Sequence, residues 1–190
     1  MKKNIVIKFS LLVVMAAFAF TACNNDKTNE SKEVAENTND QQLEGKSAEK
    51  DAQFLVDAVS NSYDEILVAE AAIAKSANAG IKTLAKQIKD EHTALLNELK
   101  TVAGSKAVTI PTGASDDAMK ETAALNEKKA VDFDKAWLEE VEDIHENSLR
   151  KYESAANDAT DMAIKNWAST NLAKIKGHLD MINNMQEKVK

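Results

Sequence analysis

Three histidines lie at positions where the sequence pattern predicts large apolar side chains. His92, His145 and His178 each fall on the apolar stripe of a different predicted helix, and Glu70 takes the equivalent place on a fourth. A polar group inside a helical core lowers stability unless it is hydrogen-bonded or bound to a metal ion. One such group on each of four helices predicts a shared interior site made of these four residues.

Two kinds of chemistry fit such a site. Three imidazoles and one carboxylate suit a single Zn²⁺, Cu²⁺ or Ni²⁺ ion, because imidazole nitrogens are good ligands for these metals. Alternatively, neutral histidines can hydrogen-bond to Glu70, Tyr63 or Asn171 and fix the register of the helices, and this network is the favoured interpretation of the two. A mononuclear metal site and a buried polar network therefore both stay open.

A di-iron centre is disfavoured by the spacing of the acidic residues. Di-iron centres in helical bundles take a Glu from each of two helices and a Glu-x-x-His motif from each of the other two. Only Glu142 and His145 have this spacing, because Lys and Ile stand three residues before His92 and His178. Glu142 is therefore only a secondary candidate ligand beside the four residues above.

Helical periodicity dominates the chain after residue 50. Apolar residues recur every three or four positions, which predicts long helices over residues 51–78, 81–103, 132–156 and 161–187 and a short helix over 116–126. The connection over residues 104–131 is long enough to return along the helices. The predicted fold class is all-α: residues 51–190 form a ferritin-like four-helix bundle with a long crossover that carries the short helix.

Residues 1–22 have the pattern of a signal peptide, and Cys23 follows them directly. Lysines precede an apolar run over residues 11–20, which is too short for a membrane-spanning helix. The small residues before Cys23 resemble the lipobox of bacterial lipoproteins, in which the cysteine is acylated; an ordinary secretory signal with a chance cysteine is the alternative. We expect the only cysteine to carry the lipid, and the polar segment up to residue 50 to form a flexible tether.

The charge of the chain excludes some classes of partner. Its 31 acidic residues exceed 24 basic ones, giving −7, and cleavage after residue 22 would remove three lysines and leave −10. Nucleic-acid binding needs a basic face, which an acidic chain with a single arginine, Arg150, does not offer. The expected partners are a membrane, through the lipid anchor, and another protein.

The chain resembles a ferritin-like family of unknown function found among bacterial exported proteins and lipoproteins. The resemblance covers about residues 51–185 and rests on Asp51-Ala52-Gln53-Phe54, Asp90-Glu91-His92-Thr93, Phe133-Asp134-Lys135-Ala136-Trp137 with His145, and His178-Leu179. It implies a ferritin-like bundle and no established activity. The chain departs from the family pattern at Glu91 and Ile144, where similar sequences often have Asp, and at Ala173, where a proline is common.

These observations favour a non-catalytic role in the cell envelope. We expect a lipoprotein held at the periplasmic side of the outer membrane that acts through protein contacts or stress protection. The alternative is a periplasmic protein that binds a divalent metal ion through Glu70, His92, His145 and His178. The sequence contains no supported Ser/His/Asp constellation and no phosphate-binding glycine loop, so it predicts no catalytic residue.

Overall fold

The chain folds into helices throughout the part that a computed structural model describes, residues 29–189. There are six in this range, with no strand: α1 (Asn29–Gln42), α2 (Lys46–Lys75), α3 (Ala79–Ser105), α4 (Asp116–Glu127), α5 (Ala130–Asp158) and α6 (Met162–Val189). The predicted all-α fold class is confirmed. The predicted signal peptide and the lipid anchor at Cys23 lie outside the described residues.

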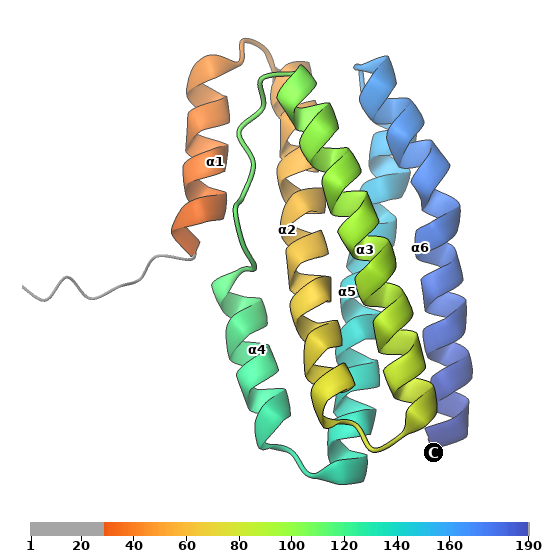
Figure 1. The fold of residues 1–190 in the computed structure, drawn as a ribbon. Helices are drawn as coiled ribbons and strands as arrows, with labels where there is room; N and C mark the ends of the chain where they lie inside the picture. The colour runs from red at the N-terminus through yellow and green to blue at the C-terminus, as the bar shows by residue number, and fades with distance from the viewer. Residues whose placement is uncertain (1–28, 190) are drawn as a thin grey trace, which may run out of the picture.

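The four long helices α2, α3, α5 and α6 lie side by side, and α3 and α5 run in the same direction (Figure 1). A short turn joins α2 to α3, and the side chain of Asn78 caps α3 by accepting from the backbone N–H groups of Gly80 and Ile81. After α3, the chain returns along the helices through an extended segment and α4 before α5 begins (Figure 1). This return is what allows α3 and α5 to be parallel.

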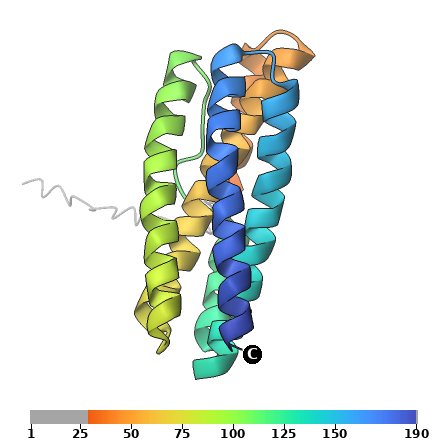
Figure 2. The ribbon, with the colours of Figure 1, turned by 90° about the vertical axis from the view of Figure 1, so that its right-hand side faces the viewer.

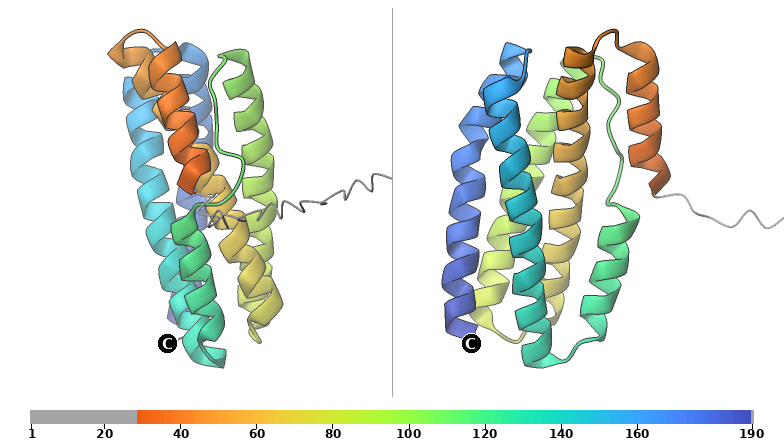
Figure 3. Two further views of the ribbon diagram at one scale, coloured as in Figure 1. Left: turned by 90° about the vertical axis from the view of Figure 1, so that its left-hand side faces the viewer. Right: turned by 180° about the vertical axis from the view of Figure 1, so that it is seen from behind.

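Helices α1 and α4 cover the outer side of α2, whereas no helix within residues 29–189 lies over the junction of α3 and α6. Figure 3 shows α1 and α4 beside α2, and Figure 2 shows α3 and α6 facing the viewer directly. Helix α2 is consequently packed on several sides, against α3, α5, α4 and α1. This difference between the two sides of the molecule decides which carboxylates are buried.

The prediction of a flexible tether up to residue 50 is wrong for residues 29–42, which form α1, and for residues 46–50, which begin α2. Helix α1 has little apolar surface, and hydrogen bonds hold it in place. The Asn39 side-chain amide donates to the Thr109 carbonyl at 2.9 Å and accepts from the Thr109 N–H at 2.8 Å. Lys32 of α1 also pairs with Asp57 of α2 at 2.6 Å. Such polar docking to a distant segment leaves no apolar period in the sequence.

Two hydrophobic clusters fill the interior, one toward each end of the long helices. The first includes Phe54, Leu55, Leu95, Leu99, Tyr152, Ile164 and Ile175, and the second includes Val68, Ile81, Ile88, Trp137, Val141 and Ile182. Each histidine stands between the two clusters: His92 between Ile88 and Leu95, His145 between Val141 and Tyr152, and His178 between Ile175 and Ile182. The helical period therefore brings all three to the same buried layer.

No helix within residues 29–189 is both long enough and apolar enough to cross a membrane.

Candidate metal centre

The structure brings the three predicted histidines together in the core. His92 is 2% exposed, His145 0% and His178 1%. Their ring centroids lie 5.1–5.4 Å apart in all three pairs. One nitrogen of each ring lies within 4.8 Å of the corresponding nitrogen of the other two. Three potential ligand atoms from α3, α5 and α6 thus surround one point between the two hydrophobic clusters.

Backbone and carboxylate acceptors occupy the outward-facing nitrogens of two of the rings. His145 Nδ1 lies 2.7 Å from the carbonyl oxygen of Val141, and His178 Nε2 lies 3.0 Å from Glu91 Oε2. A carbonyl oxygen and a carboxylate can only accept, so we assign the ring proton to Nδ1 of His145 and to Nε2 of His178. The other nitrogen of each neutral ring then carries a bare lone pair.

Those two bare nitrogens face one another at the centre of the cluster. His145 Nε2 and His178 Nδ1 are 3.1 Å apart, and neither neutral ring has a proton left to place between them. His92 adds to the mismatch, because neither of its ring nitrogens has a hydrogen-bond partner. Three buried imidazoles therefore point unsatisfied acceptor atoms at one place, which is the arrangement that a bound cation resolves.

Burial keeps the histidines neutral. Together with the neighbouring imidazoles, it lowers the pKa of His145 to about 3 and the pKa of His92 well below its ordinary value of 6.5. Burial also lowers the pKa of His178, although the hydrogen bond to Glu91 opposes this effect. Neutral imidazole is the form that binds metal ions, so the three side chains are in their ligand state at pH 7.

A buried carboxyl group that sequence reasoning missed stands behind His145. Glu65 of α2 is 0% exposed, and its Oε1 lies 3.2 Å from His145 Nδ1. The hydrogen on Nδ1 is directed to Val141, so both Glu65 oxygens have no hydrogen-bond partner. Despite the short distance the contact is not an ion pair at pH 7, because burial raises the pKa of Glu65 well above its ordinary value while it lowers that of His145.

The interpretation that Glu70 belongs to the site is wrong. Its side chain is 52% exposed and pairs with Lys89 at 2.7 Å on the surface. The prediction that Glu70 lies on the apolar stripe of its helix placed the buried face of α2 at the wrong positions. The buried positions in this part of α2 are instead Ser62, Glu65, Val68, Ala69 and Ala72, and Glu65 among them meets His145 of α5. These residues repeat at helical spacing. If Ser and Ala had been treated as possible core residues, this spacing would have placed Glu65 on the buried face.

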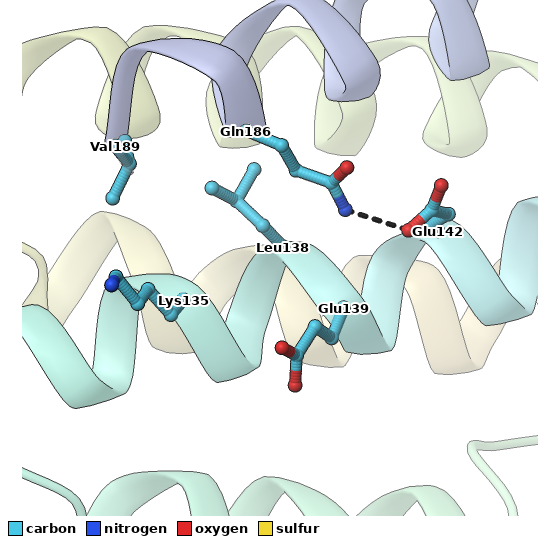
Figure 4. A pocket seen from close by; sticks show the side chains of 6 residues that line it. All are labelled: Lys135, Leu138, Glu139, Glu142, Gln186 and Val189. Atoms are coloured by element: carbon cyan, nitrogen blue, oxygen red, sulfur yellow. Dashed lines mark hydrogen bonds between the residues drawn. The ribbon is translucent and has the colours of Figure 1, made fainter.

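The other suggested partners also lie elsewhere. Asn171 is buried, but its side-chain amide donates to the Trp167 carbonyl at 3.0 Å. The ring of Tyr63 lies under the Lys100 ammonium, 5.1 Å from the centroid. Glu142 accepts from Gln186 at 2.6 Å in a surface groove between α5 and α6, as Figure 4 shows. The contacts of His145 and His178 are therefore with Val141, Glu91 and each other, and not with Glu70, Tyr63, Asn171 or Glu142.

Comparison with protein families gives one match. The sequence model described as a domain of unknown function (DUF4142) matches residues 35–185, a range that contains the three histidines, Glu65 and Glu91. Comparison with curated proteins found no match, and comparison with solved structures found none.

Proposed function

Because the chain belongs to the family described as a domain of unknown function (DUF4142), which implies no activity, we propose a function from its own side chains: it binds one divalent metal ion through His92, His145 and His178. The observation that carries this proposal is the pair of bare nitrogens of His145 and His178, 3.1 Å apart. Two nitrogens on one tetrahedral Zn²⁺ ion, each bound at about 2.0–2.1 Å, lie roughly 3.3 Å apart. The side chains therefore stand close to a ligand arrangement already.

The hydrogen-bond acceptors at the outward-facing ring nitrogens favour a metal site over a hydrogen-bond network. Histidine ligands of metals almost always donate their other N–H to a carboxylate or a backbone carbonyl, which fixes the tautomer. His178 has Glu91 in this place, and His145 has Val141 with Glu65 beside it. A network would instead need a proton between the inner nitrogens. Imidazole ligands suit Zn²⁺, Cu²⁺ or Ni²⁺.

Elemental analysis tests the proposal directly. The protein, purified without a histidine tag and dialysed against each metal in turn, is expected to retain about one ion per chain, as a single closed site predicts. Bound metal should also raise the melting temperature, since at 100 times the Kd it stabilises the folded state by about 2.7 kcal/mol. Absence of stoichiometric metal together with an unchanged melting temperature for all three ions would refute metal binding.

We also propose that the helices form a ferritin-like four-helix bundle with a mononuclear site. The parallel course of α3 and α5, and the return of the intervening chain along the helices, support this assignment (Figure 1). A mononuclear site is favoured over a di-iron site because Glu142 lies in the α5–α6 groove and does not accompany His145 into the core.

We propose further that the domain is attached by Cys23 to the periplasmic side of the outer membrane. The support is the lipobox-like sequence before that cysteine. Cys23→Ser should move the protein from the membrane fraction to the soluble fraction, because it removes the thiol that carries the lipid. Thr21→Ser, which keeps a small residue before the cysteine, is the matched control. Unchanged membrane association of Cys23→Ser on fractionation would contradict the anchor.

A further inference from the structure

We propose that the cation reaches the three histidines between α3 and α6, where Glu91 binds it first at the surface and transfers it to His178. This inference rests on the proposed metal binding and concerns its route. A route is required because the three rings are almost fully buried and water cannot reach the ligand atoms directly. The helices must therefore part somewhere to admit the ion, and the surroundings of the rings differ between the possible places.

The side of the site formed by α2 is closed. Glu65 stands behind His145 on this side with 0% exposure. Beyond it, α1 and α4 lie over the outer face of α2 (Figure 3). An ion entering here would have to displace an entire covering helix as well as α2.

The α3–α6 side is not covered by any other described helix, and it carries a direct link to a ligand. Figure 2 shows these two helices with no element in front of them. Glu91 of α3 is 32% exposed, and the same carboxylate accepts from His178 of α6 at 3.0 Å. It is the one described side chain that both hydrogen-bonds to a histidine of the cluster and reaches solvent. A cation held by Glu91 is thus one side chain away from a ligand nitrogen.

A surface groove includes a side chain that contacts this carboxylate. It lies between the first part of α3 and the last part of α6, and Gln87, Met181 and Met185 are among its lining residues. The Gln87 amide donates to Glu91 Oε1 at 2.9 Å, so the groove and the carboxylate are connected. The Glu91 carboxylate thus places a negative charge next to the groove, and such a charge attracts cations.

The neighbouring groove between α5 and α6 serves as a contrast. Lys135, Glu139 and Glu142 line it, and the Glu142 carboxylate is taken up by Gln186 (Figure 4). None of its lining residues hydrogen-bonds to a histidine among the described contacts. It therefore offers a matched control, a half-buried carboxylate in a similar groove without a link to the site.

Stopped-flow measurement of Zn²⁺ uptake and release by the full chain tests the role of Glu91. Glu91→Gln should lower the association rate constant about tenfold, because the attracting charge is lost while the shape is kept. Asp90→Asn and Glu142→Gln should leave it unchanged. If Glu91 only orients His178, the dissociation rate constant rises instead and association is unaffected. That second result would overturn the route and leave metal binding intact, whereas no Zn²⁺ binding by the unaltered chain would overturn both.

A bulky label attached in the α3–α6 groove provides a second, independent test of the route. Gln87→Cys in a Cys23→Ser background is labelled with a bulky maleimide, and Thr93→Cys, an exposed position on the same helix outside the groove, is labelled in parallel. A blocked route slows association and dissociation by the same factor, at least about fivefold, and leaves Kd unchanged. A small methylthio cap at Gln87→Cys should restore the rates. Equal rates for the bulky labels at both positions would overturn the route.

Discussion

His145→Ala should lower the affinity for Zn²⁺ by more than about 100-fold, the upper end of the loss usually found for changes behind a metal ligand. The substitution removes an inner nitrogen whose tautomer is fixed by Val141, and it leaves two imidazoles, which cannot enclose the ion. Isothermal titration with Zn²⁺ would measure the loss. The Zn²⁺-dependent rise in melting temperature should disappear in the same variant.

Two further variants separate a lost ligand from a damaged fold. Glu70→Gln, on a surface carboxylate that pairs with Lys89, should bind Zn²⁺ as the unaltered chain does. His178→Leu keeps most of the side-chain volume and should lose affinity as severely as His145→Ala. Helix content measured by circular dichroism confirms that each variant is folded. Retained Zn²⁺ affinity in folded His145→Ala and His178→Leu would rule out the three-histidine site.

Glu65→Leu should stabilise the cation-free protein at pH 7 by about 1–3 kcal/mol, since it removes a buried carboxyl group that has no hydrogen-bond partner. For a domain of this size such a gain corresponds to roughly 2–12 °C in melting temperature. The same substitution should weaken Zn²⁺ binding by about 10–100-fold, because the group beside the outer nitrogen of His145 is lost. Stability and metal affinity are thus expected to change in opposite directions.

The dependence of stability on pH tests whether the buried Glu65 carboxyl group is what destabilises the cation-free protein. In the unfolded chain this carboxyl ionises near its ordinary pKa of 4.5, whereas burial raises its pKa well above that value in the folded state. The folded state therefore holds a proton that the unfolded state releases, and stability is lost as pH rises from about 4.5 toward the raised pKa. The three buried histidines act in the opposite sense, because their lowered pKa values make stability rise with pH up to about 6.5, so the effect of Glu65 is measured as a difference between two proteins. The free energy of unfolding in chelator, measured by urea titration between pH 4 and 8, should therefore rise more with pH in Glu65→Leu than in the unaltered chain. Parallel pH profiles for the two proteins would contradict this account.

The helices and the burial of the three histidines could be predicted because both follow from the same helical spacing of apolar residues. Apolar residues at three- and four-residue spacing mark the core face of a helix, and a histidine in that series must be buried with them. His92, His145 and His178 obey this rule on α3, α5 and α6. The sequence could not choose between a metal and a hydrogen-bond network, since that choice depends on which ring nitrogen meets an acceptor. In the structure these acceptors are Val141 and Glu91, and our proposal of a metal rests on them.

By itself, the sequence determined that the chain is helical and that three imidazoles enter its core, because burial of apolar surface follows local periodicity. Only the tertiary structure decided that Glu65, and not Glu70, accompanies them. Helix α2 packs against α3, α5, α4 and α1, and the contact with His145 of α5 is made by Glu65; no local pattern records which neighbours a helix has. The docking of α1 through Asn39 and the exposure of Glu91 between α3 and α6 have the same origin. They depend on contacts between segments far apart in the chain, which form only when the helices assemble.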